Sequence, residues 1–92
     1  MTHAALDDRI TLAHGVRLQW EPTQECNVLL YPEGMVQLNQ SASTILELCD
    51  GRRVVDILKT LNEQFPDAED LEDDVRAFLE DAYDRGWIQT KA

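Results

Sequence analysis

The chain contains no long apolar run. None of its hydrophobic stretches approaches the roughly 18 residues needed to cross a bilayer, and residues 1–15 lack the apolar centre of a signal peptide. The sequence therefore predicts a cytoplasmic protein with no membrane segment. Its 92 residues, of which 43% are hydrophobic, are enough for one small domain with a modest core.

The residue types that most often build catalytic sites are scarce. Cys26 and Cys49 lie 23 positions apart, which matches no zinc or redox motif, so we expect both to be reduced residues of the core or of a strand face. His3 and His14 accompany no Ser or Cys nucleophile signature, and the four glycines form no phosphate-binding loop. No enzyme activity and no cofactor are predicted.

The acidic residues do not form a recognisable metal site either. In a calcium loop that began at Asp67, Leu71 would occupy the fifth position and Glu72 would replace the glycine of the sharp turn. A solvated helix face explains these carboxylates better, and we predict no bound metal.

Positive charge is also in short supply. Eight Lys and Arg residues stand against 18 Asp and Glu residues, which gives a net charge of −10. A chain with three helices and a small sheet could be a winged-helix DNA-binding protein, but residues 69–85, its candidate recognition helix, carry eight acids against Arg76 and Arg85. Such a helix would be repelled by phosphates, so the sequence argues against nucleic acid as a partner and favours basic ones.

Three stretches show the period of two that is typical of strands. Residues 16–21 alternate cleanly, 26–31 are apolar on both faces and suit a central strand, and 35–38 form a short return strand. Pro32 and Gly34 predict a hairpin closed by a type I turn with a G1 bulge.

From Asn39 onward the period becomes helical. Asn39 is a plausible N-cap for a first helix that Gly51 ends, a second helix is expected at about 54–64, and a third at about 69–85. We therefore predict an α+β fold in which a three-stranded antiparallel sheet precedes a three-helix bundle. Residues 15–92 form the expected single domain. Residues 1–14 are assigned to a flexible segment, although Ile10 and Leu12 could also begin a strand.

The short strand at Met35–Leu38 is the best candidate for a binding surface. If it pairs on one side only, its other edge offers free N–H and C=O groups, to which an extended peptide could add as a further strand. The alternative is an edge strand with no binding role, since short edge strands are common.

The order and spacing of several motifs resemble the PqqD family of pyrroloquinoline quinone (PQQ) biosynthesis. The resemblance covers roughly residues 12–89. The motifs that carry it are RLQWE, LLYPEGMVQLN, ILELCDG, DILKTLNEQF and DDVRAFLEDAYDRGWI. The family resemblance implies a winged-helix-like RiPP recognition element, the module that recognises precursors of ribosomally synthesised and post-translationally modified peptides.

The resemblance also implies a function and a site. Members of this family act as peptide chaperones that bind the precursor peptide PqqA and present it to the radical SAM enzyme PqqE. The peptide is expected on the third strand, against the third helix. Carried over to this chain, the peptide-binding residues would be Met35, Val36, Gln37, Leu38, Val75, Phe78, Leu79, Ala82 and Tyr83. The alternative is an acidic winged-helix interaction or regulatory module unconnected with PQQ. A homodimer formed through exposed strand edges is also compatible with the sequence.

Overall fold

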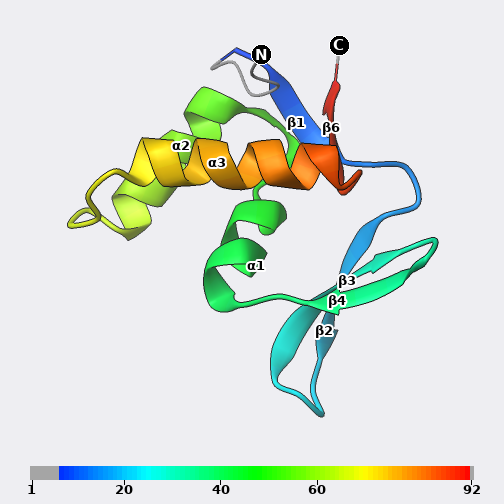
Figure 1. Cartoon of the computed structure of the whole chain (residues 1–92). Helices are drawn as coiled ribbons and strands as arrows, with labels where there is room; N and C mark the ends of the chain where they lie inside the picture. Colours follow the sequence, from blue (N-terminus) through cyan, green and yellow to red (C-terminus); the bar gives the residue numbers. More distant parts are fainter. Residues whose placement is uncertain (1–6, 92) are drawn as a thin grey trace.

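A computed structural model describes residues 7–91 and shows strands and helices interleaved along the chain (Figure 1). The strands are β1 (Arg9–Leu12), β2 (Arg17–Glu21), β3 (Cys26–Tyr31), β4 (Gly34–Gln37), β5 (Asp50–Arg53) and β6 (Ile88–Lys91). The helices are α1 (Gln40–Glu47), α2 (Val54–Gln64) and α3 (Leu71–Asp84). The predicted α+β class is confirmed, but the described residues contain two three-stranded sheets where the sequence predicted one.

The first sheet is the antiparallel meander β2–β3–β4, which was predicted from the sequence. Its hairpin loop differs from the prediction. Tyr31 pairs with Gly34, so the loop contains only Pro32 and Glu33. Gly34 has a φ of 157°, far from the left-handed helical value that a G1 bulge requires. The turn closes without a bulge, and Gly34 is the first residue of β4.

The second sheet has the order β5–β1–β6 and was not predicted. Its strands come from three distant parts of the chain, and β1 pairs antiparallel with both of the others. The strand β1 lies within the segment 1–14 that the sequence assigned to a flexible end, but its Ile10 is only 1% exposed. Residues 1–6 of that segment lie outside the described residues. Sheet β5–β1–β6 therefore ties both ends of the described chain into the core.

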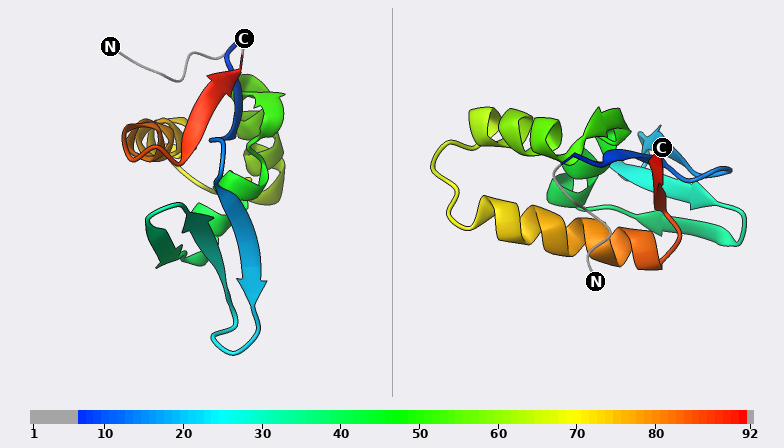
Figure 2. Two further views of the ribbon diagram at one scale, coloured as in Figure 1. Left: turned by 90° about the vertical axis from the view of Figure 1, so that its right-hand side faces the viewer. Right: turned by 90° about the horizontal axis from the view of Figure 1, so that it is seen from above.

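The three helices form close to where they were expected. Asn39 caps α1, because its side-chain Oδ1 accepts a hydrogen bond of 2.7 Å from the backbone N–H of Ala42. The expected stop at Gly51 is wrong, since α1 ends at Glu47 and Gly51 lies within β5 with a φ of 102°. Figure 2 shows α2 and α3 side by side, joined by one loop, while sheet β2–β3–β4 extends away from them.

One hydrophobic core joins the helices to both sheets. Ile10 and Ile88 come from sheet β5–β1–β6, Leu29 from β3, and Ile57 and Leu79 from α2 and α3. A polar contact adds to the link between α1 and β3: the Asn27 side-chain amide donates to the hydroxyl of the buried Ser43. Burial of this kind is the main source of stability in a small domain. The core holds α1 and α3 at fixed positions relative to sheet β2–β3–β4.

Candidate functional site

One edge of β4 has no partner among the described strands. In the order β2–β3–β4 this strand pairs only with β3. The backbone N–H of Leu38 donates to the carbonyl of Asn27 at 3.0 Å, so Leu38 and Asn27 form a hydrogen-bonded pair of the two strands. Because hydrogen-bonded and non-bonded pairs alternate between antiparallel strands, Met35 and Gln37 direct their backbone N–H and C=O groups away from β3. The open edge therefore offers two donors and two acceptors.

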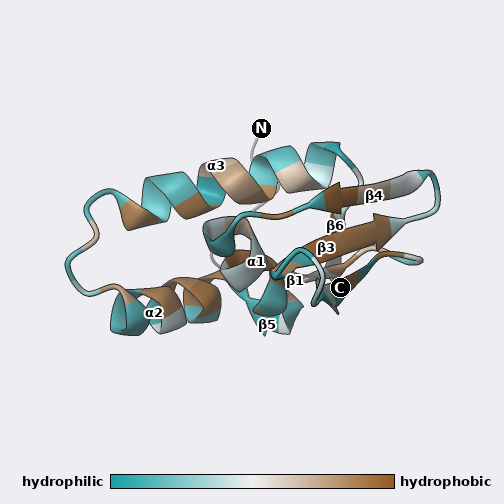
Figure 3. Cartoon of the chain, turned by 90° about the horizontal axis from the view of Figure 1, so that it is seen from below, coloured by the Kyte–Doolittle hydropathy of each residue, from teal (hydrophilic) through white to brown (hydrophobic). Residues whose placement is uncertain are grey.

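The side chains of this strand divide between the two faces of the sheet. Leu38 is 7% exposed and belongs to the core, and Val36 is half-buried against it. On the other face Met35 is 53% exposed, and the Gln37 amide donates to the side-chain oxygen of Gln24. The colouring of Figure 3 shows that β3 and β4 are both predominantly hydrophobic.

A cleft begins where β4 ends and runs between α1 and α3. Its volume is about 310 Å³. Asn39, the residue that joins Leu38 to α1, lies at one end of it. The residues that line this α1–α3 cleft are Asn39, Ser41, Ala42 and Ile45 on the α1 side, and Leu71, Asp74, Val75 and Phe78 on the α3 side. An extended chain paired with β4 would thus continue directly into a largely apolar hollow.

The predicted wall residues of α3 do not all face this cleft. Val75, Leu79 and Ala82 are at most 1% exposed and form part of the core, although Val75 also reaches the floor of the cleft. Phe78 is half-buried and lines the cleft. At 3.6 residues per turn, Tyr83 lies about 140° around the helix from Phe78. It shares the flank of Glu72, which borders α2, so the structure separates these two aromatic residues.

Several lining residues were not predicted as part of the site. The sequence assigned Asn39 to a helix cap and did not place Ser41, Ala42 or Asp74 in the binding site. These residues line the cleft because α1 packs across from α3, and the sequence pattern does not show which helices face each other. Asn39 was the one available clue, because a cap directly after an edge strand places a helix N-terminus beside that edge.

The charged groups around the cleft are acidic or paired. Asp74 is exposed and contributes the one carboxylate that lines it. About three helical turns beyond Asp74, Arg85 follows the end of α3; it donates to the Asp81 carboxylate at 2.8 Å and lies over the Trp87 ring at 5.3 Å from its centroid. No Lys or Arg lines the cleft in the described part of the chain. The cleft therefore suits apolar side chains with a cation at its rim.

Two described side chains with shifted pKa values, Cys49 and Asp50, do not line the cleft. Burial raises the pKa of the Cys49 thiol to about 12, and its Sγ donates to the carbonyl of Ile45 at 3.4 Å, so this thiol stays protonated at neutral pH. The hydrogen bonds from Arg52 lower the pKa of Asp50, but that pair belongs to β5, away from the lining residues. Among residues 7–91 no group of His, Cys, Asp and Glu side chains could hold a metal ion, and no helix is long and apolar enough to span a membrane.

Comparison with known proteins agrees with this fold. Residues 26–88 match the family model "Coenzyme PQQ synthesis protein D (PqqD)". The chain is 50% identical over 90 residues to a "PqqA binding protein" of Azotobacter vinelandii, covering 97% of this chain and 98% of the relative. The chain belongs to the PqqD family. A protein of the same name from Klebsiella pneumoniae is 52% identical over 80 residues, covering 86% of this chain and 87% of the relative.

A solved structure of a PqqD domain supports the same conclusion. It is the PqqD truncation of Methylobacterium extorquens PqqCD, described as a functional and stand-alone RiPP recognition element. It superimposes with a TM-score of 0.76 at 30% identity, and the match covers 96% of each chain. The α+β arrangement with two small sheets and three helices is thus the fold of this PqqD domain.

Proposed function

We propose that this member of the PqqD family binds the precursor peptide PqqA as an added strand on β4 and presents it to the enzyme PqqE. The observation that carries the proposal is the continuity of the open β4 edge with the α1–α3 cleft, both described above. Curated relatives at about half identity are named for PqqA binding, which supports the choice of peptide.

The strand edge and the cleft contribute different parts of the recognition. Main-chain hydrogen bonds to Met35 and Gln37 supply affinity and register without reading side chains. Alternate side chains of the added strand then point toward the face that carries Val36 and the cleft. There they meet Phe78, whose half-buried ring provides an apolar contact. Selectivity for PqqA comes from these alternate positions.

Presentation to PqqE follows from holding the peptide on one surface and the enzyme on another. Simultaneous binding converts the encounter between enzyme and peptide into a nearly intramolecular step, with an effective concentration in the millimolar range for a short connection. In this role the chain acts as a recognition module and not as a catalyst.

The decisive experiment removes one backbone N–H from the open edge of β4 and leaves the hydrogen bonds between β4 and β3 in place. The backbone N–H of Gln37 faces away from β3, so Gln37→Pro removes a donor that the fold does not use, at an edge where proline is tolerated. Gln37→Thr is the matched control, because it changes the same side chain and keeps the N–H. We expect PqqA, titrated by calorimetry, to bind at least tenfold more weakly to the proline variant than to the threonine variant.

Two further measurements make this result interpretable. Equal thermal midpoints for the two variants would show that both are folded. Amide shifts of the wild-type protein on adding PqqA should centre on Met35, Gln37 and Phe78. Equal affinity of both variants for PqqA, or shifts confined to sheet β5–β1–β6, would place the peptide elsewhere.

A further inference from the structure

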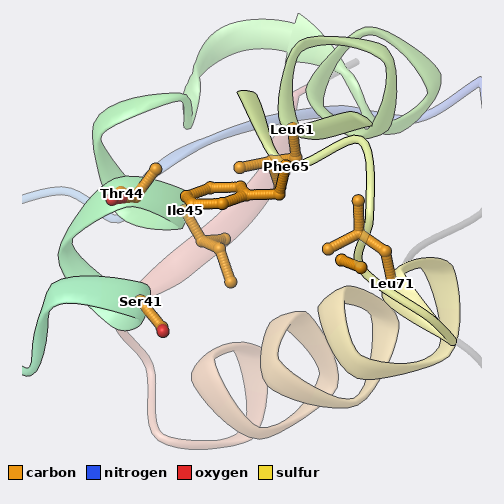
Figure 4. Close-up of a pocket in the computed structure, with 7 residues that line it drawn as sticks. Ser41, Thr44, Ile45, Leu61, Phe65 and Leu71 are labelled. Carbon is orange, nitrogen blue, oxygen red and sulfur yellow. The ribbon is translucent and has the colours of Figure 1, made fainter. Parts of the chain in front are cut away.

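A second hollow lies next to the α1–α3 cleft, between α1, the end of α2 and the loop that leads into α3. Its volume is about 230 Å³. Figure 4 shows its side chains, with the Phe65 ring extending toward Ile45 and with Leu71 on the opposite side. Its lining residues are Ser41, Thr44, Ile45, Leu61, Phe65, Ala68 and Leu71. We refer to it as the Phe65 hollow.

The walls of this hollow are apolar and incompletely covered. Ile45 and Leu61 form a buried floor, at 9% and 2% exposure, but Phe65 remains 44% exposed. Phe65 is held in this position because it is the C-cap of α2: its N–H donates to Leu61 at 2.8 Å, and Pro66 prevents the helix from continuing. An apolar ligand side chain entering here would cover the Phe65 ring and gain the usual free energy of apolar burial.

The Phe65 hollow continues the site proposed for the peptide. Ser41, Ile45 and Leu71 line both it and the α1–α3 cleft, so the two hollows adjoin. A peptide that pairs with β4 and runs through the cleft reaches the Phe65 hollow within a short extension.

The charges around the hollow restrict the flanking residues of such a ligand. The loop after Phe65 exposes Asp67, Glu69 and Asp70, and Asp74 borders the cleft on the other side. No Lys or Arg lines either hollow in the part of the chain that the structure describes. A basic residue next to the buried side chain would face these carboxylates, whereas an acidic one would be repelled.

We infer that the Phe65 hollow is a second recognition pocket, which takes an apolar or aromatic side chain from the segment of the bound peptide that flanks its β4-paired residues. This inference rests on the proposed function, because its occupant is the same peptide. The pocket would anchor one side chain and fix how far the peptide extends past β4.

The test fills the pocket and compares long with short peptides. Ala68→Phe places a ring in the hollow, and Ala77→Phe adds the same ring on the exposed outer face of α3 as a control. The ligands are synthetic PqqA and versions shortened stepwise from each end. For the wild type and Ala77→Phe, we expect one truncation to lower affinity about tenfold, which corresponds to about 1.4 kcal/mol at 25 °C. For Ala68→Phe, full-length PqqA should bind no better than that shortened peptide.

A direct contact provides a second readout that needs no variant. In the wild-type complex, nuclear Overhauser effects should connect the Phe65 ring to the side chain that the critical truncation removes. The inference is overturned if those contacts are absent, or if Ala68→Phe binds full-length PqqA as well as Ala77→Phe does. It is also overturned if Ala68→Phe abolishes a dimer seen by sedimentation while PqqA binding is unchanged, because the pocket would then join two copies. No PqqA binding by the wild type would instead refute the proposed function itself.

Discussion

The two sheets differ in how their strands are distributed along the chain. Sheet β2–β3–β4 consists of consecutive strands joined by short loops, and it extends away from α2 and α3 (Figure 1). Sheet β5–β1–β6 joins strands from the start, middle and end of the described chain and lies against α2 and α3. The long-range sheet β5–β1–β6 thus ties distant parts of the described chain together, while the local sheet β2–β3–β4 carries β4, the strand that we propose pairs with the peptide.

The largest effect should follow from damaging the long-range sheet. Ile10 lies on β1, the central strand, and is 1% exposed. Ile10→Ala leaves a cavity and should reduce the free energy of unfolding by about 3 kcal/mol. Urea denaturation followed by circular dichroism measures it. Val55→Ala, at a position 37% exposed on α2, serves as the control and should change stability by less than about 0.5 kcal/mol. Similar small effects for both variants would show that β1 contributes little to the core.

The local sheet could be predicted because its signals lie close together in the sequence. The alternation in 17–21, the two apolar faces of 26–31 and the turn at Pro32 all act within a few residues. The stretch DGRR at Asp50–Arg53 does not alternate apolar and polar residues, so its sequence does not indicate a strand. It forms β5 by pairing with β1. Sequence periodicity contains no information about which distant segments will pair, so the second sheet was missed.

The same limit applies to the candidate site. A helical stripe shows which residues of α3 avoid water, but it does not separate the core from an adjoining cleft. Val75, Leu79 and Ala82 proved to be at most 1% exposed, while Phe78 borders open space. Leu38 is likewise a core residue, so a charged substitution there would test stability more than binding. The site prediction itself stays a prediction until binding is measured.

The two cysteines allow the sheets to be compared within one protein. Cys49 directly precedes β5 and is buried, whereas Cys26 begins β3 and is partly exposed. Burial raises the pKa of Cys49 from 9.0 to about 12. Above pH 9 the Cys49 thiol of the unfolded chain loses its proton, while the buried thiol of the folded chain keeps it. Because only the unfolded state gains from this ionisation, the free energy of unfolding falls as pH rises toward 12. At pH 10.5 this loss should reach about 2 kcal/mol relative to pH 8.

The measurement compares the pH dependence of unfolding in three proteins. Wild type and Cys26→Ala should lose stability between pH 8 and pH 10.5 by about 2 kcal/mol more than Cys49→Ala does. At pH 8 a thiol reagent should modify Cys26 rapidly and Cys49 only after unfolding. Rapid modification of both thiols would mean that Cys49 becomes exposed as readily as Cys26. Parallel pH profiles in all three proteins would mean that burial does not raise the pKa of Cys49.

A smaller effect distinguishes the two flanks of α3. Phe78 lines the cleft beside the local sheet, while Tyr83 lies about 140° around α3 from it, on the flank of Glu72 that borders α2. Phe78→Leu should weaken PqqA binding about fivefold to tenfold, equivalent to about 1 to 1.4 kcal/mol, because part of an apolar contact is lost. Tyr83→Leu is the matched control and should leave the affinity within twofold. The opposite ranking by calorimetry would move the peptide to the α2 side of α3.

The smallest predicted effect lies where the local sheet joins the helices. Asn39 follows β4 and caps α1 through its bond to the N–H of Ala42, so it connects the strand edge to the cleft wall. Asn39→Ala should lower the free energy of unfolding by about 1 kcal/mol, and Asn39→Asp should restore most of it. If PqqA relies on α1 as a fixed wall, the alanine variant should also bind it more weakly, with the loss recovered by Asp. Loss of stability without any change in affinity would show that the local sheet holds the peptide without help from α1.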